Sequence, residues 1–278
     1  MRGILAGNIA RLRRARGLTQ EALATGLGIT FQAVSKWETG QTVPDTLLLP
    51  PLARALGVSV DKLLGYSAFA DEKSFYEDSY LREEYFWGLQ PSVMCLKVLE
   101  LTPPVRPLKL LDIGCGEGKD AVFFARCGYE VSAFDISEAG LEKTRRLAER
   151  AGVRVRAFRA DICDFRLGEK YDILFSSGTL HYIKPALRDE IMANYKANVA
   201  AGGLVAFQVF VEKPYIALPY EKENLHRWKS GQLFTHFHDW HIEYCTEYLS
   251  DCNLPGVTPR YAANRLLARR TGGREFFS

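Results

Sequence analysis

The sequence predicts two folds in one chain, an all-α domain over residues 1–67 and an α/β domain over residues 108–278. Apolar residues repeat at helical spacing through the first 67 residues. From residue 108, short apolar strands alternate with amphipathic helical stretches, which is the pattern of a parallel sheet covered by helices on both faces. A glycine-rich turn, LLDIGCGEGKD, ends the first of these strands, where such sheets bind their ligands.

Composition and charge narrow the class of protein. The 278 residues are 47% hydrophobic, and no run approaches the roughly 20 apolar residues of a membrane span. Six cysteines without a C-x-x-C pair are typical of a reducing compartment, so we expect a cytoplasmic protein with no membrane partner and no metal site. Residues 1–67 carry eight Lys and Arg against four Asp and Glu, a charge of +4 within a total of +3. This excess predicts a polyanionic partner for the first domain.

Five short helices are predicted in the first domain, over residues 5–17, 20–28, 30–40, 44–56 and 59–64. Thr19 is a capping residue for the second helix. Only a Gly-Leu-Gly-Ile turn separates the second helix from the third, so the two helices must cross steeply. The arrangement is a helix-turn-helix.

Residues 5–66 resemble the helix-turn-helix domain of the XRE, Cro and phage-repressor-like regulators. The residues that carry this resemblance are Gln20, Ala24, Gly28, Val34, Ser35, Trp37, Glu38, Gly40 and Pro44. It implies that the third helix enters the major groove of double-stranded DNA and that the contacts come from Gln20, Thr30, Phe31, Gln32, Ser35 and Lys36. Further phosphate contacts are expected from Arg11, Arg13, Arg14 and Arg16. Because such units read paired half-sites, a homodimer is expected; the alternative is a fold retained for dimerisation or protein contact without DNA.

Residues 68–107 are predicted to form a linker followed by an aromatic and helical segment. The aromatic residues are Phe75, Tyr76, Tyr80, Tyr85, Phe86 and Trp87, and a helix is expected from Pro91 to Leu101. The aromatic cluster either lies over the ligand as a lid or packs an N-terminal helix on the sheet.

The glycine turn does not fit a phosphate. Gly114, Gly116 and Gly118 form G-x-G-x-G, whereas the third glycine of the dinucleotide pattern would fall on Lys119, and no P-loop G-K-S or G-K-T follows. Asp112 and Glu117 would repel a pyrophosphate, but they would attract a ligand that bears an amine and a sulfonium.

Two carboxylates follow on the next strands. Asp135 ends the second strand, where it can accept hydrogen bonds from both hydroxyls of a ribose. Asp161 ends the third strand, where it can bind the amino group of adenine. Together with the glycine turn they describe an adenosine without phosphates, which indicates S-adenosyl-L-methionine.

The motifs LLDIGCGEG, VSAFDIS, RADICDF and YDILFSSGTLHYI resemble those of class I S-adenosylmethionine-dependent methyltransferases, over residues 108–270. The resemblance implies a Rossmann-like seven-stranded sheet whose last strand is antiparallel. The cofactor-binding residues that it implies are Asp112, Gly114, Cys115, Gly116, Gly118, Asp135, Ile136, Asp161, Ile162 and Ser176. Asp112 would contact the ligand amine through water or brace the loop. His181 would lie near the methyl group as a catalytic residue.

The acceptor is predicted to be a small molecule. The motif N-P-P-Y does not follow the fourth strand, where GTLHYI stands instead, and this argues against a DNA base or an amide acceptor. Thiols and metalloid or chalcogen oxyanions remain. A finer resemblance to the tellurite-resistance and thiopurine-methyltransferase-like group implies that Arg260 holds an anionic acceptor.

Three alternatives stay open. His236, His238 and His241 could form a metal site if the first two shared a strand face, and Cys163, Cys245 and Cys252 could trap a soft ion. The whole chain could instead be a transcriptional regulator that binds S-adenosylmethionine or a metabolite as an effector without turnover.

Overall fold

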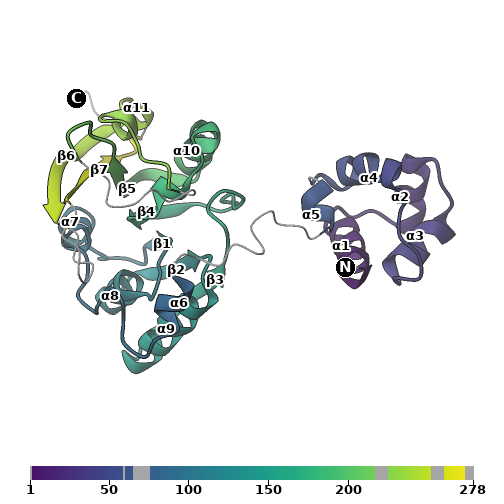
Figure 1. Cartoon of the computed structure of the whole chain (residues 1–278), viewed down its shortest axis with the longest axis horizontal. Helices are drawn as coiled ribbons and strands as arrows, with labels where there is room; N and C mark the ends of the chain where they lie inside the picture. Colours follow the sequence, from purple (N-terminus) through teal and green to yellow (C-terminus); the bar gives the residue numbers. More distant parts are fainter. Residues whose placement is uncertain (1, 59, 65–75, 217–224, 252–259, 273–278) are drawn as a thin grey trace. The chain divides into compact units, whose positions relative to one another are not determined.

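The structure is a computed structural model, and it describes residues 2–58, 60–64, 76–216, 225–251 and 260–272 of the chain. The residues divide into two compact units, Met1–Lys73 and Ser74–Ser278, shown in Figure 1. Each unit is described by itself.

The first unit is all-α, as predicted. Its elements are α1 (Arg2–Ala15), α2 (Gln20–Leu27), α3 (Phe31–Glu38), a 3₁₀ turn η1 (Thr46–Leu48), α4 (Leu49–Leu56) and α5 (Val60–Leu64). The hydroxyl of Thr19 accepts the N–H of Ala22, and that of Thr30 accepts the N–H of Ala33, so both threonines cap the helices that follow them. Gly28, at φ 67°, ends α2 in the left-handed conformation and begins the turn into α3.

Apolar residues from every helix of this unit meet in one core. Ile9, Val34, Leu52 and Leu63 have no exposed surface. The fourth predicted helix starts later than expected, because Asp45 caps a 3₁₀ turn and the α-helix begins only at Leu49.

The second unit is α/β. Its strands are β1 (Lys109–Ile113), β2 (Glu130–Asp135), β3 (Val155–Arg159), β4 (Tyr171–Ser177), β5 (Val199–Val211), β6 (His241–Asp251) and β7 (Arg260–Arg269). Its helices are α6 (Glu77–Tyr80), α7 (Val93–Leu101), α8 (Lys119–Cys127), α9 (Glu138–Arg150), α10 (Arg188–Ala197) and α11 (Gln232–Phe237), with 3₁₀ turns η2 (Leu180–Tyr182) and η3 (Pro185–Leu187). The sequence did not predict α6.

The seven strands form one sheet in the order β3-β2-β1-β4-β5-β7-β6. β1 to β5 are parallel to one another, whereas β7 is antiparallel to both β5 and β6. This confirms the predicted sheet and its antiparallel last strand. The strand order reverses between β1 and β4, so the glycine turn after β1 lies at the switch point where open sheets bind ligands.

Both faces of the sheet are covered. Val205, Phe207 and Val209 of β5 pack in the layer that contains α10 and α11, while Leu204 and Ala206 pack in the layer that contains α7, α8 and α9 (Figure 1). Alternate side chains of one buried strand thus serve two apolar layers. Among the described residues, no helix is long and apolar enough to cross a membrane.

Candidate functional site

The turn after β1 requires glycine for steric reasons. Gly114, Gly116 and Gly118 have φ values of 74°, 55° and 84°, in the left-handed region that favours glycine. A Cβ on Gly114 would lie 2.2 Å from Oγ1 of Thr179, whose hydroxyl donates to the carbonyl of Gly114 at 3.1 Å. A Cβ on Gly118 would lie 2.6 Å from the side chain of Thr144. The three glycines therefore let neighbouring side chains close tightly on the turn.

Asp112 lies beneath this turn with 2% of its surface exposed. Burial, with a smaller contribution from the charge of Asp120, raises the pKa of Asp112 well above its usual range. Within the described part of the chain, Oδ2 of Asp112 is a buried oxygen without a hydrogen-bond partner. A buried acidic oxygen of this kind suits a cationic ligand better than a phosphate.

Asp135 is fixed by the backbone at the end of β2. Its Oδ2 accepts the N–H of Gly116 at 2.8 Å, and its Oδ1 accepts the N–H of Ser137 at 2.9 Å. Burial raises the pKa of Asp135, and these backbone hydrogen bonds oppose the rise. A carboxylate has about four acceptor positions, so these hydrogen bonds do not use the whole capacity of Asp135. Asp135, which the sequence identified by its position about twenty residues after the glycine turn, thus contacts the turn itself.

The residues predicted to flank adenine follow the neighbouring strands. Ile136 is half-buried after β2, and Ile162 is buried after β3. Oδ1 of the half-buried Asp161 accepts the N–H of Cys163 at 2.7 Å. The structure therefore brings Asp112, Asp135 and Asp161 to the carboxyl ends of three adjacent strands.

The aromatic segment covers the glycine turn, and sequence reasoning did not identify which of its residues do so. Tyr80, at the end of α6, is 5% exposed, and a Cβ on Gly116 would lie 2.9 Å from its hydroxyl. Nε1 of Trp87 donates to that hydroxyl at 3.0 Å. Oε1 of Glu77 accepts the N–H of Ala139, near the start of α9. α7, in contrast, packs on the sheet, as the second of the two predicted roles requires.

Glu117 does not act as predicted. Its Oε1 lies 2.8 Å from Nζ of Lys143, and its Oε2 accepts the N–H of Trp87 at 3.2 Å. Its charge is therefore balanced within the protein, and its role is to hold the aromatic segment rather than to attract a ligand.

Three other predicted residues are deeply buried. Ser176 has no exposed surface, and its hydroxyl donates to the carbonyl of Ile113 at 3.0 Å, so it joins β4 to β1 and does not reach a ligand in this conformation. Cys115 donates its N–H to Phe134, and burial raises the pKa of its thiol well above the usual range. His181, in η2, is 1% exposed, and its ring stacks on Phe210 with centroids 4.2 Å apart.

Arg260 begins β7, where it pairs with Asp251, but its side chain lies outside the described residues. Cys252 of the suggested cysteine cluster also lies outside them. The suggested histidine site is wrong in its geometry, because His236 belongs to helix α11 rather than to a strand. Within the ranges that the structure describes, no three His, Cys, Asp or Glu side chains are grouped to hold a metal ion.

In the first unit, α3 exposes the predicted DNA-contact face. Thr30, Phe31, Gln32 and Lys36 are exposed and Ser35 is half-buried. The opposite face, with Val34 and Trp37, is buried in the core, as expected.

Two of the residues predicted to contact DNA have partners within the protein. Arg13 is buried and paired with Glu38, so the prediction for Arg13 is wrong. The amide nitrogen of Gln20 donates to the same Glu38 at 2.9 Å.

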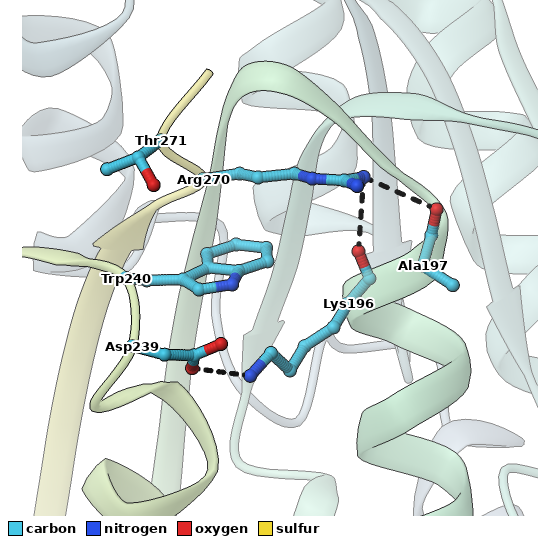
Figure 2. Close-up of a pocket in the computed structure, with 6 residues that line it drawn as sticks. All are labelled: Lys196, Ala197, Asp239, Trp240, Arg270 and Thr271. Carbon is cyan, nitrogen blue, oxygen red and sulfur yellow. Dashed lines mark hydrogen bonds and ion pairs between the residues drawn. The ribbon is translucent and has the colours of Figure 1, made fainter. Parts of the chain in front are cut away.

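A pocket at the other end of the sheet is lined by Lys196, Ala197, Asp239, Trp240, Arg270 and Thr271 (Figure 2). It lies beside Val199 at the amino end of β5, away from the glycine turn. Arg270 donates to the carbonyl of Ala197, the last residue of α10, and Nζ of Lys196 lies 2.5 Å from Oδ1 of Asp239. These cations bind groups of the protein, so we assign the pocket a structural role.

Comparison with known proteins identifies both units. Residues 9–63 match the family model of the helix-turn-helix, and residues 110–203 match that of the methyltransferase domain. The uncharacterized HTH-type transcriptional regulator y4dJ of Sinorhizobium fredii is 46% identical over 59 residues, which cover 21% of this chain and 77% of that protein.

The second unit is similar to TehB of Haemophilus influenzae, a probable S-adenosyl-L-methionine-dependent methyltransferase. The two sequences are 23% identical over 182 residues, which cover 64% of this chain and 62% of TehB. The crystal structure of TehB from Haemophilus influenzae has the same fold, with a TM-score of 0.59 and 17% identity over 71% of this chain and 66% of that one. The chain spans 35% to 62% of the length of the first curated relatives that it matches.

Proposed function

Since the chain belongs to the helix-turn-helix family and its residues 110–203 match the model of the methyltransferase domain, we propose that it methylates a small molecule with S-adenosylmethionine and binds double-stranded DNA through residues 1–67. The observation that supports methyl transfer most strongly is the set formed by Asp112, the glycine turn and Asp135. This set combines a buried acidic oxygen that has no hydrogen-bond partner among the described residues with a carboxylate that is fixed by the backbone.

The residues present fit S-adenosylmethionine. Asp135, held by the backbone of the glycine turn, would accept hydrogen bonds from the ribose hydroxyls. Asp161 would accept the adenine amino group, and Ile136 and Ile162 would pack against the adenine ring. Asp112 would stabilise the positive charge of the ligand from below the turn, in line with its buried, unpaired Oδ2.

When bound, this cofactor would supply a methyl carbon attached to a sulfonium. A lone pair of the acceptor would form the new bond to that carbon, and the electrons of the broken carbon–sulfur bond would stay on sulfur, which becomes a neutral thioether. The protein's contribution is alignment and exclusion of water. Tyr80 would help to exclude water, because its hydroxyl lies against Gly116 and is held there by Nε1 of Trp87. The acceptor would be held near His181, at the carboxyl end of β4.

The DNA-binding proposal rests on α3. Its exposed face carries side chains that donate and accept hydrogen bonds and one cation, Lys36, while its buried face fixes the helix in the fold. We further propose a homodimer, since helix-turn-helix units read paired half-sites, and a location in the cytoplasm with the DNA.

Calorimetric titration of the full chain with S-adenosylmethionine, followed by mass-spectrometric detection of methylated products from aliphatic and aromatic thiols, selenite, tellurite and arsenite, tests the proposal. Micromolar binding with a methylated product is the expected result. Absence of cofactor binding would overturn it.

A second candidate is a regulator that binds the cofactor without turnover. One observation favours it: α6, which contacts the glycine turn through Tyr80, starts within four residues of the boundary between the two units. Cofactor binding without product, together with a cofactor-dependent change in DNA affinity, would support this candidate.

A further inference from the structure

A polar and aromatic group lies on one face of β5, β7 and β6. Gln208 pairs with Arg265 across β5 and β7, and Phe210 pairs with Ala263, which in turn pairs with Tyr248 of β6. Directly paired residues of neighbouring strands point to the same side of a sheet. We call Gln208, Phe210, Tyr248, Tyr261 and Arg265 the β7 array.

The array stands at the ligand-binding edge of the sheet. Gln208 is in register with Ser177, the last residue of β4. The ring of Phe210 lies 4.2 Å from that of His181 and 4.9 Å from that of Tyr261, measured between centroids. His181 belongs to η2, which follows Thr179, and the hydroxyl of Thr179 is bonded to the glycine turn. Ring contacts thus connect the array to the cofactor side of the sheet.

Hydrogen bonds fix the polar part of the array. Oε1 of Gln208 accepts two hydrogen bonds, one from the hydroxyl of Tyr248 and one from Nε of Arg265, each at 2.8 Å. The guanidinium carbon of Arg265 lies 4.2 Å from the centre of the Tyr248 ring. Arg265 is therefore held in one orientation by a neutral amide and an aromatic face.

The charge of Arg265 contrasts with that of Arg269 on the same strand. Arg269 is neutralised by Glu243 at 2.6 Å and also donates to Leu101 and Gly202. In the part of the chain that the structure describes, Arg265 has no carboxylate within ion-pair distance. A half-buried, oriented guanidinium without a counter-charge is suited to a ligand anion.

We propose that the β7 array binds the methyl acceptor and that this acceptor is a planar aromatic molecule with an anionic group. Arg265 binds the anion, and Phe210, Tyr248 and Tyr261 contact the ring, since flat rings pack on aromatic side chains. This inference rests on the proposed methyl transfer, whose acceptor it specifies, and it assigns the anion to Arg265 rather than to Arg260.

Ligand-observed NMR on the full chain saturated with S-adenosylhomocysteine tests this assignment. The probes are benzoate, benzamide, which lacks the charge, and cyclohexanecarboxylate, which lacks the flat ring. We expect benzoate to bind at least tenfold more tightly than either analogue. Arg265→Gln should reduce the preference for benzoate over benzamide to less than threefold, whereas Arg265→Lys should retain part of it. The exposed Arg146→Gln on α9 is the control and should match the unmodified protein.

Tyr248→Leu distinguishes the contribution of the flat ring from that of the charge. It should reduce the preference for benzoate over cyclohexanecarboxylate, whereas the preference for benzoate over benzamide should persist. Equal binding of benzoate and benzamide, or an unchanged preference in Arg265→Gln, overturns the assignment. Affinity for S-adenosylhomocysteine should be the same in all variants. If S-adenosylhomocysteine does not bind the unmodified protein, the proposed methyl transfer itself fails, which is a distinct outcome.

Discussion

Arg13 and Glu38 form a buried, two-point ion pair that joins α1 to the end of α3. Nε and Nη2 of Arg13 lie 2.6 and 3.0 Å from the two carboxylate oxygens of Glu38. Burial acts to raise the pKa of Glu38, but the hydrogen bonds from Arg13 and Gln20 outweigh it and hold the pKa below its ordinary value. Glu38 therefore stabilises the fold above the pKa of the unfolded chain, and this stabilisation is lost as the pH falls through its lowered pKa.

Glu38→Gln should destabilise the helical unit by about 3 kcal/mol, because it leaves the guanidinium of Arg13 buried without a counter-charge. Hydrogen exchange of the full chain, read on peptides from residues 2–58, measures the effect locally. The exposed Arg54→Gln on α4 is the control. Equal protection in both variants would contradict the role given to this pair.

Substitutions at two exposed residues of α3 should affect different properties of DNA binding, one the overall affinity and the other the sequence selectivity. On a site selected from random duplexes, Lys36→Ala should weaken binding to all sequences and reduce the salt-dependence slope by about 1. Gln32→Ala should reduce discrimination against single-base changes by about 1 to 3 kcal/mol. The exposed Arg54→Ala on α4 is the control. Gel-shift titrations at several salt concentrations test both expectations, and identical salt slopes for all variants would argue against a phosphate contact at Lys36.

Asp135→Ala should weaken S-adenosylmethionine binding by about 3 kcal/mol or more, roughly two powers of ten, since two hydrogen bonds to a charged acceptor are lost. The exposed Asp164→Ala is the control. Calorimetry provides the affinities. Full affinity in Asp135→Ala would show that the ribose assignment is incorrect.

Gly114→Ala and Gly178→Ala form a matched pair. Both glycines have left-handed φ values, 74° and 91°, but a Cβ on Gly114 would meet Thr179, whereas a Cβ on Gly178 would meet open space. Gly178→Ala should cost about 1 kcal/mol of unfolding free energy from backbone strain alone, and Gly114→Ala should cost more and also impair cofactor binding. Thermal unfolding and cofactor titration of both variants would show this difference, and equal behaviour would mean that contact with Thr179 is unimportant.

Asp112→Asn should change the pH dependence of stability. Because burial raises the pKa of Asp112, the folded state binds more protons than the unfolded state between about pH 4 and that raised value. Stability therefore falls as the pH rises through this window, and this loss should be absent from Asp112→Asn. The variant should be more stable than the unmodified protein at neutral pH but bind the cofactor less tightly. Denaturant titrations across pH 4 to 8 provide the test, and parallel pH profiles would contradict it.

The strands and helices of both units could be predicted because their pattern depends on residues that lie close together in the sequence. Alternation of strands and helices implied the parallel sheet, and the glycine turn and Asp135 follow from motifs with fixed spacing. Thr19 and Thr30 were recognisable as caps or helix starts from residue type alone.

Pairings between distant residues could not be predicted in this way. Arg13 looked like one more surface cation until Glu38, 25 residues away, was found beside it. Glu117 looked like a free acid until Lys143, 26 residues away, was found to pair with it. A local pattern gives the residue type and its spacing, but whether a charge is compensated depends on the tertiary fold. The same reason explains why Arg265 was missed.

The position of β7 also bears on how the second unit is completed. β7 is the last strand along the chain, yet it lies between β5 and β6 in the sheet. During synthesis, β5 and β6 therefore emerge before the strand that joins them, and each presents an unpaired edge until β7 is made. A nascent chain that ends before residue 260 therefore lacks the strand that pairs with both β5 and β6.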